Sequence, residues 1–123
     1  MSGPPPGTRV LIVEDEMIIA MTVEDMIEEM GGTVADTATT LAQALDCADA
    51  GGFDVAILDV NLNGEPSLAV ARRLAETGVP FLFTTGYGNL GACEDFADAV
   101  VVKKPYRLEE LAGAIAQALG EGP

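Results

Sequence analysis

Four short apolar runs of the sequence each end in polar residues that could do chemistry. The residues that follow these runs are Glu14-Asp15, Asp59, Thr84-Thr85 and Lys103-Lys104. Asp59 directly follows the run Val-Ala-Ile-Leu, so its carboxylate must lie near buried surface, where an isolated charge is costly. Crowding against Glu14 and Asp15 raises that cost unless a divalent cation holds the acids together. Carboxylate and carbonyl oxygens are the ligands that Mg²⁺ selects.

A carboxylate nucleophile, Mg²⁺, a lysine and a hydroxyl are the parts of a site that accepts a phosphoryl group. Carboxylates do form aspartyl-phosphate intermediates. The transferred group spreads its charge over three equatorial oxygens, so the transfer depends on positioning and electrostatic stabilisation. We therefore expect Asp59 to be the phosphoacceptor. The metal, Lys104 and Thr85 are each expected to stabilise one oxygen of the group.

Five apolar runs alternate with helical patterns along the chain. The expected strands are Arg9–Val13, Thr33–Ala38, Asp54–Leu58, Pro80–Thr84 and Ala99–Val102. The expected helices are Glu16–Met30, Thr40–Ala50, Ser67–Thr77 and Arg107–Leu119, with at best a short helix over Asn89–Phe96. This alternation predicts an α/β fold with a doubly wound parallel sheet. The functional crevice of such a sheet lies beyond the carboxyl ends of its strands, where the four polar groups would meet.

The composition is that of a globular, strongly acidic chain. Its 123 residues are 49% hydrophobic and suffice for one domain. We expect a disordered Pro/Gly tail over residues 1–7, one domain over residues 8–120 and no output domain. The net charge of −14 repels nucleic acid and anionic membranes, so neither is an expected partner. No apolar run is long enough to span a bilayer and there is no secretory signal, so a cytoplasmic protein is expected.

The sulfur-containing residues and the lack of histidine narrow the chemistry further. Without histidine, zinc sites of the Cys/His kind and Ser-His or Cys-His catalysis are excluded. Cys47 lies in an Ala/Leu-rich helical stretch and is expected in the core, whereas Cys93 lies in a polar stretch and could be exposed. The methionines of the first expected helix are predicted to fill the core rather than to form a binding surface. They are Met17, Met21, Met26 and Met30.

On these residues the chain resembles the receiver domains of two-component response regulators over about residues 8–119. The resemblance rests on four signals in order, each at the end of the proper strand. These are the acidic pair Glu14-Asp15, the phosphoacceptor Asp59, the switch hydroxyl Thr85 and the pair Lys104-Pro105. The segment Phe83 to Gly88 also resembles the "FAT GUY" subgroup, which is typical of alphaproteobacterial stress and light signalling.

The resemblance implies a fold, a ligand set and a partner class. The implied fold is a flavodoxin-like (βα)5 doubly wound parallel sheet with strand order 2-1-3-4-5. The resemblance implies that Mg²⁺ is bound by Asp15, Asp59 and the backbone carbonyl of Asn61, with Glu14 acting mostly through water. It also implies a cis bond between Lys104 and Pro105. The phosphodonor is expected to be a sensor histidine kinase or a histidine phosphotransfer protein, with a downstream protein target as a further partner. Whether the protein is a messenger, a phosphate sink or a kinase regulator stays open.

Two features depart from the pattern of many receivers. The fifth strand carries Val101 where others have a Tyr or Phe that rotates inward on activation, so ring rotation there cannot be the readout. Tyr87 or Tyr106 could replace it, or each could be an ordinary packed aromatic. The glycines of residues 85–96 predict a loose segment, which we expect phosphorylation to order when Thr85 is drawn to the phosphoryl group.

Three rival interpretations remain. Residues 86–91 match the glycine pattern of dinucleotide sites, but the next strand ends in lysines instead of the acid that binds ribose. A haloacid-dehalogenase-like phosphatase would also use a strand-end aspartate with Mg²⁺, but it needs a second aspartate two residues on, where this chain has Asn61. The third is a receiver that binds proteins independently of phosphorylation. We favour a protein that catalyses only its own phosphoryl transfer and autodephosphorylation and is not otherwise an enzyme.

Overall fold

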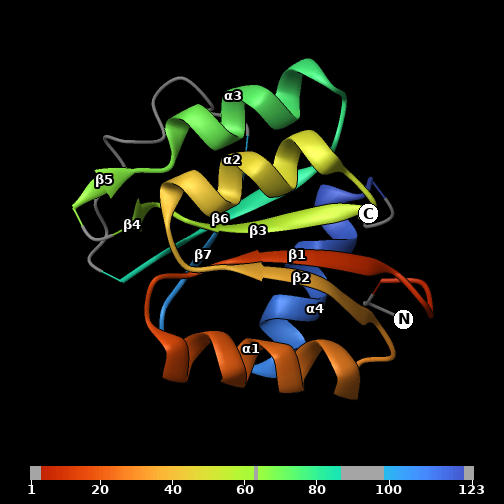
Figure 1. Ribbon diagram of the computed structural model, residues 1–123. Coiled ribbons are helices and arrows are strands. Elements are labelled where there is room, and N and C mark those ends of the chain that lie inside the picture. The colour runs from red at the N-terminus through yellow and green to blue at the C-terminus, as the bar shows by residue number, and fades with distance from the viewer. Residues whose placement is uncertain (1–3, 63, 87–98, 121–123) are drawn as a thin grey trace.

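Apolar runs form a five-stranded parallel sheet in the computed structural model, which describes residues 4–62, 64–86 and 99–120 (Figure 1). The strands are β1 (Arg9–Val13), β2 (Thr33–Ala38), β3 (Val55–Asp59), β6 (Phe81–Thr85) and β7 (Val100–Lys103). Their order across the sheet is β2-β1-β3-β6-β7, and each neighbouring pair is parallel. This confirms the predicted fold class and strand order.

Three strands begin and end one residue later than the sequence pattern predicts. Main-chain pairing continues past the apolar runs, because Asp59 pairs with Thr84 and Thr85 pairs with Lys103. Asp59, Thr85 and Lys103 are therefore the last residues of their strands, and not loop residues. A strand-end position fixes the backbone of a side chain that must act in the crevice beyond the sheet.

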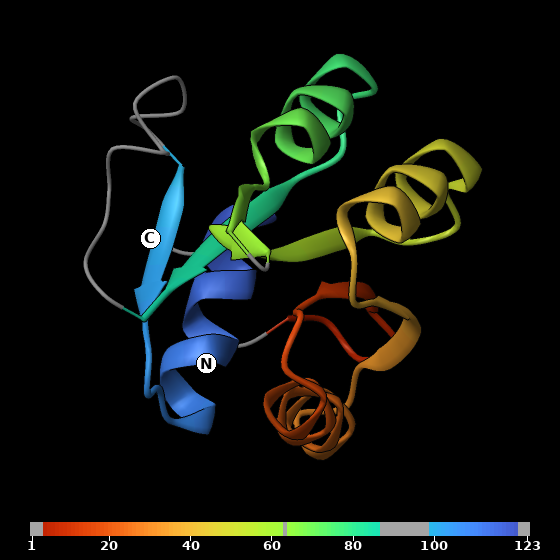
Figure 2. The same ribbon diagram turned by 60° about the vertical axis from the view of Figure 1, so that its left-hand side comes forward.

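Within the described residues, four helices cover the two faces of the sheet in pairs. They are α1 (Met17–Glu29), α2 (Leu41–Ala50), α3 (Leu68–Glu76) and α4 (Leu108–Ala118). Helices α2 and α3 lie on one face and α1 and α4 on the other, as the view turned by 60° also shows (Figure 2). Each agrees with a predicted helix within one residue at either end. The short helix expected over residues 89–96 lies outside the described residues.

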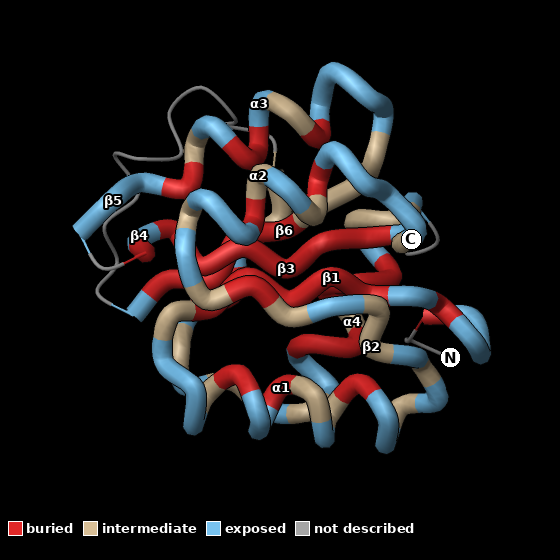
Figure 3. The backbone as a smooth tube through the Cα atoms, viewed as in Figure 1, coloured by how far each residue is buried: buried red, intermediate tan, exposed pale blue. Residues whose placement is uncertain are grey.

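Alternation along the strands builds one core on each face, because successive side chains point to opposite sides. Leu58 and Phe83 belong to the core under α2 and α3, whereas Ile57 and Leu82 belong to the core under α1 and α4. The strands at the centre of the sheet are accordingly buried along most of their length (Figure 3). A rigid platform of this kind holds the ends of its strands in fixed positions.

A small hairpin follows β3 directly and was not predicted. Strand β4 (Asn61–Leu62) pairs antiparallel with β5 (Glu65–Pro66). Gly64 in its turn has a φ of +87°, a conformation that glycine adopts at little cost. The sequence pair Asn63-Gly64 is a hairpin signal, but strands of two residues are too short for a pattern to show.

The prediction that all methionines of the first helix fill the core was wrong for two of them. Met17 and Met21 are each 56% exposed, while Met26 and Met30 pack against the core. The buried face of α1 is formed by Ala20, Val23 and Ile27 instead. The helix is apolar on several sides near its start, so apolar spacing alone did not identify the face that meets the sheet.

The remaining expectations concern the cysteines and the N-terminal segment. Cys47 is half-buried beside the core under α2, with its thiol 3.4 Å from the Asp36 carboxylate, and Cys93 lies outside the described residues. Burial, followed by the nearby Asp36, raises the pKa of Cys47 to about 11.

Within the tail predicted over residues 1–7, the structure describes residues 4–7, and Gly7 donates a hydrogen bond to the Gly31 carbonyl at 2.8 Å. Among the helices described, none is long and apolar enough to cross a membrane.

Candidate functional site

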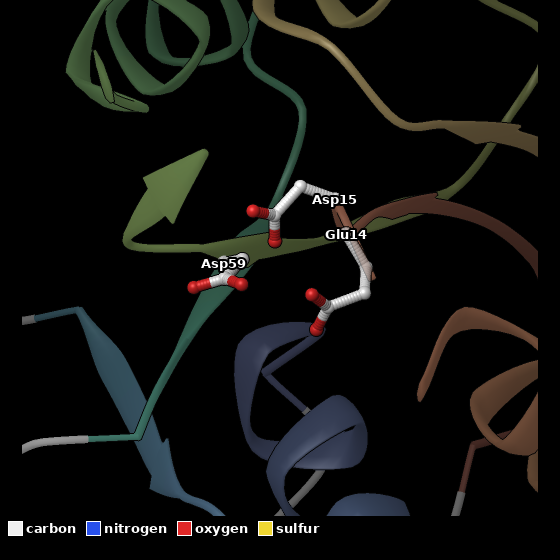
Figure 4. Close-up of side chains that lie close together, drawn as sticks. All are labelled: Glu14, Asp15 and Asp59. Carbon is white, nitrogen blue, oxygen red and sulfur yellow. The ribbon is translucent and has the colours of Figure 1, made fainter. Parts of the chain in front are cut away.

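Three carboxylates meet at the carboxyl end of the sheet (Figure 4). Val13 of β1 pairs with Leu58 of β3, so the residues that follow them, Glu14 and Asp59, emerge side by side. Asp15 points into the same space, and one oxygen of each of the three carboxylates lies within 4.8 Å of the others. Parallel register therefore assembles the acidic cluster that the sequence predicted.

Lys104 joins two of these acids. Its Nζ donates to Glu14 Oε1 at 2.7 Å and to Asp59 Oδ2 at 3.0 Å. Both carboxylates are buried, with 3% and 7% of Glu14 and Asp59 exposed. The backbone of Lys104 is fixed because its N–H donates to the Thr85 carbonyl at 2.8 Å, one residue beyond the end of β7. The Lys104-Pro105 peptide bond is cis, as the resemblance implied.

The cluster carries more negative charge than its lysine balances. Burial raises the pKa of Glu14 to about 7; the hydrogen bond from Lys104 opposes this rise and the nearby Asp59 adds to it. Burial alone would lower the pKa of Lys104, but its hydrogen bonds and ion pairs with Glu14 and Asp59 leave that pKa above the ordinary value. Lys104 is therefore one cation in contact with two carboxylates of a three-carboxylate cluster. An oxygen-only donor set with this excess of negative charge fits Mg²⁺.

A cavity of about 490 Å³ opens over the cluster. Its lining includes the predicted site residues Asp15, Asp59, Asn61, Thr85 and Lys104. Ile19 of α1 and Glu16, which immediately precedes this helix, complete one wall. The volume exceeds that of a phosphoryl group, so the cavity has room for part of a donor as well.

Thr85 and Thr84 have different surroundings. Both are buried, but Thr85 lines the cavity, whereas Thr84 is not among the lining residues. Neighbouring side chains of a strand point to opposite faces, so only one of the pair can face the crevice. The Thr84 carbonyl instead accepts a hydrogen bond from the Val60 N–H at 3.0 Å. This geometry agrees with the choice of Thr85 as the candidate hydroxyl.

Asn61 contacts the acceptor aspartate through its backbone. The Asn61 N–H donates to Asp59 Oδ1 at 3.2 Å, so the two oxygens of Asp59 have different partners, Asn61 and Lys104. A contact that sequence reasoning missed is the Glu16 N–H, which donates to Glu14 Oε2 at 3.2 Å. No residue type signals such a backbone donor, because any residue at position 16 except proline could supply it.

The sequence departs from the receiver pattern at Val101 and in the glycine-rich segment after Thr85, and the structure describes only the first of these in full. Val101 is 38% exposed on β7, and Tyr106 is half-buried against the core under α1 and α4. Burial raises the pKa of Tyr106 to about 12, so its hydroxyl stays protonated. Tyr87, the segment expected to become ordered on phosphorylation and most of the glycine pattern over residues 86–91 lie outside the described residues.

Comparison with known proteins agrees with this fold. The family model of the response regulator receiver domain matches residues 10–116. The structure is similar to that of SdrG from Sphingomonas melonis, with 43% sequence identity, a TM-score of 0.83 and coverage of 94% of this chain and 99% of that one. It is also similar to the receiver domain of the response regulator PhyR from Erythrobacter litoralis, with 30% identity, a TM-score of 0.81 and coverage of 94% and 92%.

The curated relatives are longer proteins. The phyllosphere-induced regulator PhyR of Methylorubrum extorquens is 32% identical over 117 residues, which are 92% of this chain and 44% of that protein. The chain spans about half the length of the curated relatives it matches. The family match extends from β1 into α4 and includes every predicted site residue. The chain therefore belongs to the family of response regulator receiver domains.

Proposed function

We propose that Asp59 accepts a phosphoryl group from a phosphohistidine of a sensor kinase or phosphotransfer protein, with Mg²⁺ bound by the acidic cluster. The observation that carries the proposal is the position of Lys104, whose ammonium group bridges Glu14 and Asp59 at the base of a cavity. A buried carboxylate held beside a fixed cation and open to a cavity is suited to receive an anionic group. Family membership supports the same role.

The transfer exchanges one bond to phosphorus for another. An oxygen of Asp59 forms a bond to phosphorus as the bond between phosphorus and the donor nitrogen breaks. The electron pair of the broken bond stays on that nitrogen, and a proton on the other ring nitrogen lets it leave as neutral imidazole. Lys104, which contacts Asp59, would hold one oxygen of the transferred group, and the hydroxyl of Thr85, which lines the cavity, would hold another. Mg²⁺, when bound, would neutralise further negative charge on the group.

Asp15, Asp59 and the backbone carbonyl of Asn61 would hold the metal, with Glu14 acting mostly through water. The closeness of the three carboxylates supports this ligand set. In this role the protein catalyses only its own phosphorylation and dephosphorylation. Asn61 supports that limit, since a phosphatase of the haloacid-dehalogenase kind needs an acid at this position.

An apolar patch beside the cavity favours a protein as the donor. Met17, Ile18 and Met21 are exposed on α1, and Ile18 is 82% exposed. Ile19 of the same helix and Glu16, which immediately precedes it, line the cavity. A donor protein that buries this patch gains apolar contact, whereas a small free donor cannot cover it. A kinase or phosphotransfer donor would place this protein in the cytoplasm.

Labelling with acetyl phosphate and Mg²⁺ tests the proposal by intact-protein mass. Asp54→Asn is a matched control, because Asp54 immediately precedes the same strand at its other end and accepts a hydrogen bond from the Arg9 N–H. Wild type and Asp54→Asn should each gain one phosphoryl group, and Asp59→Asn none. An adduct on Asp59→Asn would refute the assignment. Absence of any adduct, with acetyl phosphate and with a cognate kinase, would favour a phosphorylation-independent binding module.

A further inference from the structure

The hairpin after Asp59 is closed by one side chain. Asn61 Oδ1 accepts a hydrogen bond from the Gly64 N–H at 2.7 Å, and Leu62 pairs with Glu65 across the turn. Because the donor is a backbone N–H, the side-chain atom that faces it must be the carbonyl oxygen of the amide. That oxygen is therefore engaged in the turn.

Both ends of the hairpin are tied to the body of the domain. Leu62 is 1% exposed and belongs to the core under α2 and α3. On the return side, the Ser67 N–H donates to the Val60 carbonyl at 3.0 Å, and Ser67 is itself buried. The hairpin is thus held at both ends, and the hydrogen bond from Gly64 to the Asn61 side chain fixes its turn.

The hairpin backbone in turn orients the acceptor. The Asn61 N–H donates to Asp59 Oδ1, and the Asn61 carbonyl is the proposed backbone ligand of Mg²⁺. Rotation about the backbone of Asn61 would move both groups. We propose that Asn61 is a positioning residue, whose side chain closes the β4–β5 hairpin and so holds the Asp59 carboxylate and the Asn61 carbonyl in place for Mg²⁺. This inference rests on the proposed use of Mg²⁺.

Two perturbations of the turn should have the same effect. Asn61→Ala removes the acceptor of the Gly64 N–H. Gly64→Ala leaves Asn61 unchanged, and a Cβ at Gly64 meets no atom within 4 Å, so it disturbs the turn only through its φ of +87°. Gly78→Ala is the matched control, since Gly78 has a φ of +74° and equally open surroundings between α3 and β6.

The measurements are Mg²⁺ affinity by titration calorimetry and hydrogen exchange of the Gly64 amide in the metal-free protein. Asn61→Ala and Gly64→Ala should each weaken Mg²⁺ binding about 10-fold or more, the usual effect of losing a group that orients metal ligands. Both should speed exchange at position 64. Gly78→Ala should change neither quantity. Asn61→Asp keeps an acceptor for Gly64, so slow exchange and Mg²⁺ affinity should both be retained.

The outcomes separate this inference from the proposed function. A wild-type protein that does not bind Mg²⁺ would overturn both. Wild-type binding with unchanged affinity in Asn61→Ala and Gly64→Ala would overturn only the positioning role. Loss of affinity in Asn61→Ala with exchange at Gly64 unchanged would also overturn it, because the side chain would then act directly at the metal.

Discussion

Glu14 should destabilise the metal-free protein at neutral pH, and Glu14→Gln should relieve this. The folded protein buries Glu14 beside Asp59, with Lys104 as the cation bonded to both, and burial raises the Glu14 pKa from 4.5 to about 7. A tenfold change in the proton-binding constant is worth about 1.4 kcal/mol, so the ionised side chain costs the folded state about 3 kcal/mol. A glutamine side chain in its place keeps the shape and an acceptor for Lys104 without that charge.

The pH dependence follows from the sign of the shift. Below pH 4.5 the Glu14 carboxyl is protonated in both states, so its charge costs nothing. Between 4.5 and about 7 it is ionised only in the unfolded state; unfolding then releases a proton, and the free energy of unfolding falls as pH rises. Above about 7 the group is ionised in both states, and the free energy of unfolding falls no further on account of Glu14. The free energy of unfolding of Glu14→Gln should therefore exceed that of wild type by an amount that grows from near zero at low pH to about 3 kcal/mol above pH 7.

Urea unfolding followed by circular dichroism in EDTA measures this difference at matched pH values. Glu28→Gln is the control, because Glu28 lies exposed on α1 and carries the same chemical change. Its effect on the free energy of unfolding should be small. The reasoning would be refuted if Glu14→Gln gained the same free energy of unfolding over wild type at low and at neutral pH. It would also be refuted if that gain were no larger than the gain of the control.

Three further predictions concern the metal and the phosphoryl group. Mg²⁺ at 100 times its dissociation constant should stabilise wild type by about 2.7 kcal/mol, seen as a higher Tm in calorimetry, and Asp15→Asn should lose most of this gain. An Asp15→Asn Tm that rises as much as wild type would remove Asp15 from the ligand set. Lys104→Gln should slow the mass increase with acetyl phosphate about 100-fold, as loss of a charge-stabilising donor does, and an unchanged rate would argue against its role. Beryllofluoride with Mg²⁺ should slow hydrogen exchange over residues 86–96 in wild type and much less in Thr85→Ala; an equal response would exclude Thr85 as the switch.

Much of the site could be predicted because parallel strands have a simple geometry. Apolar runs identify the buried strands, and a polar residue at the end of such a run must emerge at the carboxyl edge of the sheet. Adjacent register then brings Glu14 beside Asp59. Lys104 reaches both from just beyond the end of β7, which pairs with neither β1 nor β3. The one-residue extension of β3 and β6 could not be predicted, because Asp59 and Thr85 continue the strand through backbone pairing that side-chain hydropathy does not reflect.

Other features depend on tertiary contacts that no periodicity encodes. Met17 and Met21 belong to an apolar stretch that continues around the first turns of α1, so spacing could not decide which side meets the sheet. The hydrogen bond from Gly64 to Asn61 depends on a turn whose strands have two residues each. The rise in the Glu14 pKa depends on burial by elements distant in the chain.

The central claim is that Asp59 carries the phosphoryl group, and chemical trapping tests it most directly. The protein is phosphorylated by a phosphohistidine donor with Mg²⁺ and treated with borohydride, which reduces an aspartyl phosphate to homoserine. Peptide mapping then locates the modified residue. We predict homoserine at position 59 alone, with none in protein that was not exposed to the donor. Homoserine at another aspartate with position 59 unmodified would contradict the account.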